Sequence, residues 1–587
     1  MADLPERPRA ETREQLGFEP QGMVRWFDPV QLAGTAVQVV VSSLFGAYSD
    51  KREIQAALAA TAEPHLTHGE DGDLWFDYVA DLGDGFPSTY TVAHTLARPT
   101  LELSVGDGAP ARTERGRILV MGGDQVYPTA TRKTYEDRLV GPYRAARPYD
   151  AEAVETFPTL YAIPGNHDWY DGLTNFMRIF CKPTWIGAWR TGQERSYFAL
   201  RLPRNWWLWG IDIQFDSYID EPQLDYFRSA SKKLGEGDRL ILVTGKPSWT
   251  KGMGPNPEPS YANLAYFEDE LLKDTKAALS VVVSGDLHHY AHYVDASGGR
   301  HRITCGGGGA YLFPTHHLRG QLELEEGRKA TKRTDSYSLA SCYPPTAVSR
   351  RLRWCALWRL PLRNARLLWF LGALYFLVAL LLRSPARRAV GAGGNALDAS
   401  AGVWLDALWS PRTLFAAMVL VPVFVLFAAG RGLGTRALVG IPHAAAHLLL
   451  MLTLVVISAQ LISAGWDSYG LIVAAVAAAV ATPLGAGLIG LYLALCDLTF
   501  AQAPERLGGL ERHANEVFSC QAIGDWKSFL RFHIAADGTL TIYPIGIERV
   551  ARRGELQLDP DGAAEASFFR LPGTVRAQLI EDPIEVR

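Results

Sequence analysis

The sequence predicts an α/β domain joined to an α-helical bundle of transmembrane spans. Two observations lead to this class. Between Leu367 and Phe500 only ten of 134 residues are charged, whereas 20% of the whole chain is charged. From about Trp75 to Tyr311, short apolar, strand-like runs alternate with turns rich in Gly, Asp, Asn and His. Such charge depletion excludes a wholly soluble protein, and a length of 587 residues predicts more than one domain.

The charge-poor region contains four apolar runs, and each is predicted to be a transmembrane span. They are Leu367–Leu382, Thr413–Gly430, Ala437–Trp466 and Ser468–Cys496. The first run covers about 24 Å at about 1.5 Å per residue, short of a hydrocarbon core of about 30 Å, but its flanking arginines can reach the interface. Buried helices of a soluble core are the alternative, and they rarely contain 29 or 30 uncharged residues in succession.

The distribution of arginines predicts the topology. Arginines crowd the approach to the first span, lie between spans two and three and follow span four, whereas the connection between spans three and four carries only Asp467. An even number of spans with both large soluble parts in the cytoplasm fits most of this pattern and predicts a multi-pass protein of the cell membrane. Arg387, Arg388 and Arg412 in the first external loop count against it.

The composition along the chain predicts five parts. These are an N-terminal helical extension (1–69), an α/β domain (70–348), a basic juxtamembrane linker (349–366), the four spans (367–497) and a C-terminal soluble segment containing β-structure (498–587). In the last part, apolar runs on both sides of Asp537-Gly538 predict a β-hairpin. Tyr261–Lys276 is expected to be a helix that covers the sheet.

Several features of the soluble parts narrow the class further. Met1–Glu19 is charged and rich in proline, unlike a cleavable signal peptide. Val30–Tyr48 is uncharged but contains five polar residues, which favours a partly buried amphipathic helix over a span. The six cysteines are scattered and are expected to be free thiols in a reducing compartment. A formal net charge of −4 argues against binding to nucleic acid.

The strand–turn pattern delivers carboxylate, amide and imidazole groups to the ends of strands. It is seen in WFDYVADLGDG (75–85), RILVMGGDQVYP (117–128), TLYAIPGNHDW (159–169), RLILVTGKPSW (239–249) and LSVVVSGDLHHY (279–290). Open α/β sheets build their sites at such ends. Asp, Asn and His together suit a hydrolytic dinuclear site for Mn, Fe or Zn and fit no nucleophilic triad.

Four motifs in this order resemble the calcineurin-like metallophosphoesterase superfamily. They are Asp81–Gly83, Gly123–Tyr127, Gly165–Asp168 and Gly285–His288, and the resemblance covers about residues 70–320. It implies a β-sandwich of two mixed sheets flanked by helices. It also implies two divalent or mixed-valence metal ions, with a hydroxide held between them that attacks a phosphoester in line.

The resemblance assigns roles residue by residue. Asp81 and His288 would bind the first metal, and Asp124 would bridge both metals. Asn166 would bind the second metal through its amide oxygen. His167 would hydrogen-bond the phosphate and assist the leaving group.

Three positions raise questions about this transfer. Tyr127 matches a metal-binding tyrosinate of purple acid phosphatases, and packing at the rim of the site is the alternative. Lys246 stands where the family has a histidine, and because a lysine is a poor metal ligand it would hold phosphate oxygens. Asp286 replaces the first histidine of GHxH and would bind the second metal. This ligand set favours Mn or Mg over Zn, and Fe remains open.

For other residues the sequence leaves a functional and a structural interpretation open. Asp84 would support the site or shape its turn. His289 or His292 would line the pocket, and His316 and His317 would contact the site or lie apart from it. The run Gly306–Gly309 would approach an anion or form a plain turn. In the third span, His443 and His447 are a functional candidate or a hydrogen-bonded pair within the bundle.

The leading functional prediction is a membrane-bound, metal-dependent phosphoesterase. Its substrate would be a phosphorylated small molecule or lipid, with the lipid favoured only because the domain is tethered to a bilayer. The alternative is a degenerate domain that senses a phosphorylated ligand and signals through its spans, which Lys246 and Asp286 support. A transporter with a regulatory hydrolase domain would need more polar residues within the spans.

Overall fold

A computed structural model describes most of the chain, in two units. The described residues are 13–35, 37, 66–67, 72–106, 108, 110–149, 158–213, 219–251, 259–272, 275–326, 333–391, 401–429, 432–461, 466–499, 513–559 and 567–587. The first unit, named here the sheet unit, comprises Met1–Val24, Thr35–Thr346 and Ile523–Arg587, and the second, the helical unit, comprises Arg25–Gly34 and Ala347–Ala522.

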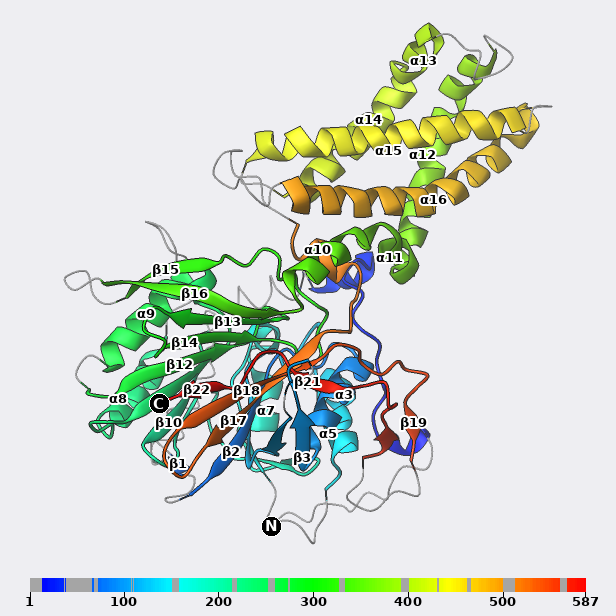
Figure 1. Ribbon diagram of the computed structural model, residues 1–587. Helices are drawn as coiled ribbons and strands as arrows, with labels where there is room; N and C mark the ends of the chain where they lie inside the picture. The colour runs from blue at the N-terminus through cyan, green and yellow to red at the C-terminus, as the bar shows by residue number, and fades with distance from the viewer. Residues whose placement is uncertain are drawn as a thin grey trace. The chain divides into compact units, whose positions relative to one another are not determined.

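The sheet unit is built on two mixed β-sheets (Figure 1). The first sheet has the strand order β1 (Leu66–Thr67), β9 (Phe198–Arg201), β10 (Trp206–Ile211), β11 (Arg239–Thr244), β12 (Ala278–Ser284), β14 (His301–Cys305), β13 (Tyr290–Asp295), β16 (Arg333–Tyr343) and β15 (Gln321–Glu326). The second has the order β21 (Ala577–Leu579), β18 (Leu540–Ile547), β17 (Lys527–Ile534), β2 (Leu74–Val79), β5 (Ile118–Met121), β6 (Thr159–Ala162), β8 (Trp189–Thr191) and β7 (Trp185–Ile186), with β22 (Ile584–Val586) on β18. Two small ribbons pair β3 (Thr100–Leu103) with β4 (Ala111–Glu114) and β19 (Gln557–Leu558) with β20 (Phe569–Arg570).

A shared hydrophobic core joins the two sheets face to face. Phe76 and Val120 of the second sheet pack in one cluster with Val243 and Val283 of the first. Helices cover the outer faces: α3 (Phe86–Ala97), α5 (Gly141–Ala146) and α7 (Thr174–Phe180) on the second sheet, and α8 (Glu221–Ser231) and α9 (Pro259–Leu272) on the first. Short helical elements are η1 (Arg13–Leu16), α4 (Arg132–Tyr135), η2 (Glu136–Val140), α6 (Asn166–Trp169) and η5 (Ser248–Lys251). Two mixed sheets flanked by helices confirm the predicted α/β architecture.

The C-terminal segment completes the second sheet. Strand β17 pairs with β2 along its length, from Leu530 opposite Tyr78 to Ile534 opposite Leu74, and Figure 1 shows orange β17 beside blue β2. The composition predicts 498–587 as a separate part, because no local sequence feature indicates that β17 pairs with β2. Residues from Ile523 onward belong to the same unit as the motifs, and the five-part division of the chain stays a prediction.

Several local predictions are confirmed. The hairpin around Asp537-Gly538 is formed by β17 and β18, with Ile534 opposite Leu540, and Gly538 adopts the positive φ of 87° that the turn requires. The predicted covering helix is α9, and all six cysteines are free. The predicted N-terminal helical extension lies largely outside the described residues, as does most of Val30–Tyr48.

Among the described residues, the helical unit contains three helices long and apolar enough to cross a membrane. They are α12 (Ala365–Gly391), α15 (Leu433–Leu461) and α16 (Trp466–Thr499), and a fourth span exists only if α13 (Ala401–Leu408) and α14 (Pro411–Phe427), bent by 58°, count as one. Four spans are therefore not confirmed. The run Thr413–Gly430 falls on α14, whose 17 residues cover only about 26 Å.

The predicted basic linker is helical. It forms α10 (Thr346–Trp354) and α11 (Ala356–Arg363), and a further short helix, α17 (Glu516–Ser519), follows the spans. Arg353 of α10 is buried with Asp497 of α16 at an N–O distance of 3.2 Å. This ion pair neutralises a carboxylate near the end of an apolar helix, where an unpaired charge would be costly.

Candidate metal centre

Three of the predicted metal ligands lie directly after parallel strands in a left-handed backbone conformation. Asp81 follows β2 with φ 58°, Asp124 follows β5 with φ 49°, and Asp286 follows β12 with φ 68°. Left-handed backbone is unfavourable for residues other than glycine, although aspartate tolerates it better than most. Such strain collects at functional sites because the surrounding fold must hold it in place.

The side chains of four predicted ligands converge on one point. The hydroxyl of Tyr127 lies 3.0 Å from Asp81 Oδ1, 3.1 Å from Asp124 Oδ2 and 3.0 Å from His288 Nε2. All four residues are buried. Tyr127 is only 1% exposed, so it lies at the centre of the cluster and not at a rim.

Glycines in the motifs make this convergence possible. A Cβ on Gly165 would lie 2.1 Å from Asp124 Oδ1, and one on Gly306 would lie 2.3 Å from Asp81 Oδ2. Any larger residue would push the carboxylates out of place. The glycine before Asn166 is therefore explained by close approach to Asp124. In the run Gly306–Gly309, Gly308 packs against the backbone of Ala80 and Gly309 against that of Leu82, which supports the interpretation of the run as a turn.

When its carboxylates are ionised, the cluster has more hydrogen-bond acceptors than protons. His288 Nδ1 lies 2.8 Å from the carbonyl oxygen of Tyr311, and because a carbonyl only accepts, Nδ1 carries the hydrogen and Nε2 presents its lone pair. Burial lowers the pKa of His288 well below its usual value, so the ring is neutral. Tyr127 then has one hydrogen for Asp81, Asp124 and His288.

The electrostatics of the site also favour a cation. The pKa of Asp81 is raised by burial first and then by Asp124 and Asp286, and the pKa of Asp124 is raised by burial and Asp286. Carboxylates crowded in a buried place cost free energy as anions unless positive charge is supplied. Buried carboxylate oxygens and an imidazole lone pair are a donor set that fits divalent metal ions.

Asn166 and His167 begin α6 directly beside Asp124. The backbone N–H of His167 donates to Asp124 Oδ1 at 2.9 Å, and Asn166 Nδ2 donates to the hydroxyl of Tyr170 at 3.1 Å. His167 Nδ1 lies 2.8 Å from the carbonyl oxygen of Pro128, which leaves Nε2 unprotonated. Burial lowers the pKa of His167 to about 4.

Asp286 and Lys246, the two departures from the family pattern, lie in different surroundings. Asp286 is half-buried, and its backbone N–H donates to Asp81 Oδ2 at 2.9 Å. Lys246 follows β11 in a turn whose Gly245 Cα lies 3.6 Å from where a Gly123 Cβ would stand. This turn therefore packs against the one that carries Asp124. The roles of both side chains stay predictions.

Two buried aspartates close to the cluster have structural contacts. Asp84 accepts from the backbone N–H groups of Val24 at 2.7 Å and Tyr311 at 3.0 Å, which supports its turn-shaping role. Asp168 accepts from Gln125 N at 3.2 Å and Gly165 N at 2.9 Å. It thereby ties together the turns that carry Asp124 and Asn166.

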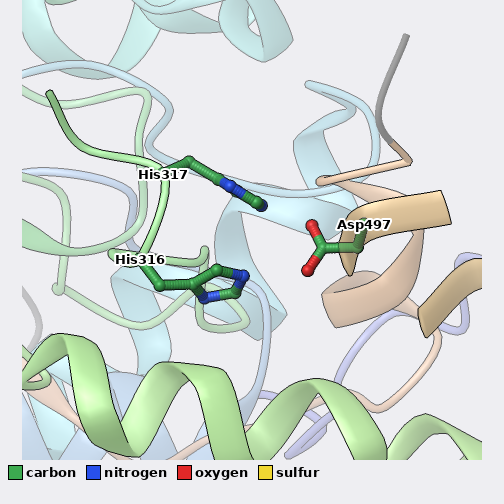
Figure 2. Close-up of side chains that lie close together, drawn as sticks. All are labelled: His316, His317 and Asp497. Atoms are coloured by element: carbon green, nitrogen blue, oxygen red, sulfur yellow. The ribbon is translucent and has the colours of Figure 1, made fainter. Parts of the chain in front are cut away.

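The histidines that the sequence left open lie in other environments. His292 lies 3.2 Å from Glu581 and 3.0 Å from His301, in a buried network that binds the C-terminal segment to the first sheet. His316 and His317 share one loop, with ring centroids 4.1 Å apart (Figure 2). Asp497, also drawn in Figure 2, belongs to the helical unit and pairs there with Arg353.

Sequence reasoning missed Lys527. This residue begins β17, is fully buried, and donates to the carbonyl oxygen of Ala310 at 2.5 Å. Burial lowers its pKa to about 8, opposed by Asp525, Asp84 and Asp81. A lone lysine in a segment without a motif gave no signal, and only the pairing of β17 with β2 brings its charge near the cluster.

Comparisons with known proteins identify a family for part of the chain. The sequence profile of the calcineurin-like phosphoesterase family matches residues 74–290, and no curated protein matches the chain. Two solved structures are similar at 12% identity: GAP50, the anchor in the inner membrane complex of Plasmodium (46% of this chain, 78% of that one, TM-score 0.30), and PhoD (42% and 59%, TM-score 0.26). These TM-scores are too low to support an argument. On its motifs and the family match, the chain contains a calcineurin-like phosphoesterase domain at residues 74–290, and its apolar helices support membrane anchoring.

Proposed function

We propose that the protein is a membrane-bound, metal-dependent phosphoesterase that hydrolyses a phosphomonoester or phosphodiester. The observation that carries this proposal is the buried cluster in which Asp81, Asp124 and His288 surround the single proton of Tyr127. A cation satisfies these acceptors better than one phenolic hydrogen can. Members of this family typically hold two metal ions, which supply positive charge for the phosphate and activate a water molecule.

The metal ligands and His167 have separate roles in this proposal. Asp81, Asp124, Asn166, Asp286 and His288 would hold the two metals, with Tyr127 as a further ligand. His167 has an unprotonated Nε2 and would accept a hydrogen bond from a phosphate hydroxyl or a water molecule. The oxygen-rich ligand set favours Mn or Mg over Zn.

Lys246 would supply a positive charge to phosphate oxygens. Its turn packs against the one that carries Asp124, which supports the proposal that its ammonium group lies near a phosphate bound at the metals. We further propose that the catalytic domain and the C-terminus are cytoplasmic. A substrate attached to a lipid fits a domain tethered to apolar helices, and a soluble phosphoester is the other substrate class.

The test compares Asp124→Ala with Asp525→Ala, which removes a carboxylate of the same unit that is 25% exposed and pairs with Arg552. Metal content of the purified full-length protein is measured together with turnover of an aryl phosphomonoester and an aryl phosphodiester. Asp124→Ala should lose bound metal and at least about 1,000-fold in turnover, roughly 4 kcal/mol of barrier. Asp525→Ala should keep both. Unchanged metal content and turnover in Asp124→Ala would refute the assignment.

A sensor without catalysis is the second candidate, favoured by Lys246 and Asp286 at positions where the family has histidines. In that case the wild-type protein would bind inorganic phosphate but turn over neither aryl substrate. The binding would depend on Asp124, so the same set of proteins separates the two functions.

A further inference from the structure

A hydrogen-bonded chain of three side chains crosses the interior of the helical unit. The hydroxyl of Tyr375, on α12, lies 2.6 Å from His447 Nδ1, and His447 Nε2 lies 3.1 Å from His443 Nε2, both on α15. His443 is 5% exposed and His447 is fully buried. This confirms the interpretation of the two histidines as a hydrogen-bonded pair within the bundle.

The direction of hydrogen bonding along this chain is determined by Tyr375. Within the described part of the molecule its hydroxyl has one hydrogen-bond partner, His447 Nδ1, so it donates there because a buried phenol keeps its hydrogen bonded. His447 Nδ1 accepts, and its Nε2 therefore carries a hydrogen and donates to His443 Nε2. The remaining hydrogen of His443 is then on Nδ1.

His443 Nδ1 is thus a buried N–H donor, and no partner for it exists among the described residues. The ring is held rigidly. It stacks on Tyr492 of α16 at a centroid distance of 4.0 Å and contacts Phe424 of α14 at 4.4 Å. An unsatisfied donor in an apolar interior is costly, so an acceptor other than the described side chains is expected to bind it.

His443 lines a cavity of about 390 Å³ between α15 and α16. The rest of the wall is mainly apolar, including Leu438, Ala446, Leu488, Leu491 and Leu495. From Leu438 to Ala446 the cavity follows α15 for about 12 Å at about 1.5 Å per residue. Its length and apolar lining fit a hydrocarbon chain.

We propose that this cavity binds a glycerolipid of the surrounding membrane, with an ester carbonyl accepting a hydrogen bond from His443 Nδ1. One N–H donor in an apolar wall fits a neutral acceptor attached to a hydrocarbon chain. A phosphate group would need more donors or positive charge. The proposal is independent of the phosphoesterase function, because every residue that it uses belongs to the helical unit.

The test compares an ester lipid with its ether-linked counterpart, which lacks the carbonyls. The full-length protein in a non-ionic detergent is titrated with dioleoyl phosphatidylcholine or its ether analogue, and bound lipid is measured by native mass spectrometry. The wild-type protein should bind one ester lipid about tenfold more tightly than the ether lipid, the effect of one hydrogen bond. Equal binding of the two lipids would overturn the proposal and indicate that water satisfies His443.

Three variants locate the site. His443→Phe should retain an aromatic ring but lose the preference for the ester lipid, and Ala446→Phe should fill the cavity and weaken both lipids. Leu449→Phe, on the same helix but 53% exposed and outside the cavity lining, should behave as the wild type. A preference that survives in His443→Phe would also overturn the proposal. The wild-type comparison needs no substitution, so it decides the question even if a variant fails to fold.

Discussion

The ion pair between Arg531 and Asp77 should be a main support of the sheet unit. Arg531 Nε donates to Asp77 Oδ1 at 2.7 Å, and a terminal nitrogen donates to Oδ2 at 3.2 Å. Both side chains are at most 1% exposed. The pair joins β17 to β2, the strand that leads to Asp81, so we expect it to hold the C-terminal segment against the candidate metal centre.

Arg531→Met should destabilise this strand pair by about 3–5 kcal/mol, because it leaves a buried carboxylate without its partner. Asp77→Leu combined with Arg531→Met should recover most of that loss, since apolar replacement of a buried pair is often neutral. The pair of Arg552 with Asp525, at 2.8 Å and with side chains 51% and 25% exposed, is the matched control. Arg552→Met should cost less than about 1 kcal/mol.

The loss should also depend on pH. Burial raises the pKa of Asp77, and Arg531 is the largest opposing influence. Without Arg531 the folded-state pKa of Asp77 rises further above its unfolded value, so Asp77 favours the folded state only while it is protonated. Stability then falls as pH rises, and Arg531→Met should be more destabilised at about pH 8 than at about pH 5.

Hydrogen exchange of the full-length protein measures this effect strand by strand. Amides of β17 and β2 should lose roughly 100- to 5,000-fold of their protection in Arg531→Met. Amides of α16 in the helical unit should be unchanged and provide an internal control. If the single variant changes protection in β17 by less than about fivefold, or if the double variant is no better, the role assigned to the pair is refuted.

Three further predictions test the organisation and the site. Replacing 347–522 by a short linker should give a soluble, folded sheet unit, because Tyr343 and Trp526, on the two sides of the deleted segment, have rings only 5.1 Å apart and a short linker can join them. A chain truncated after residue 348 should not fold, and circular dichroism distinguishes the two proteins. Lys246→Met should lower turnover about tenfold with unchanged metal content, as expected for one charged contact. Lys246→His should bind the second metal more tightly, and an unchanged metal affinity of this variant would place Lys246 outside the site. In intact cells, an impermeant thiol reagent should label a cysteine introduced near Asp467 but not one in the sheet unit, and labelling of the sheet unit would reverse the proposed topology.

The sequence by itself predicted the long apolar helices, the α/β class and the calcineurin-like phosphoesterase domain. Charge depletion is visible in composition because each residue contributes independently of the fold. The motifs were visible because a turn that holds Asp124 or Asn166 beside another strand needs glycine at a particular neighbouring position. The same local chemistry predicted the hairpin around Gly538 correctly.

The tertiary structure alone decided which distant segments meet. Strand propensity marked β17 but not its partner β2, since pairing depends on contacts between residues about 450 positions apart. That pairing moved the C-terminal segment into the sheet unit and brought Lys527 near the carboxylates. The tertiary structure also decided that Tyr127 lies at the centre of the cluster. Three of the predicted spans fall on helices long enough to cross a membrane, and the bend between α13 and α14 leaves the fourth unconfirmed. Composition measures apolar character but not the direction of a helix.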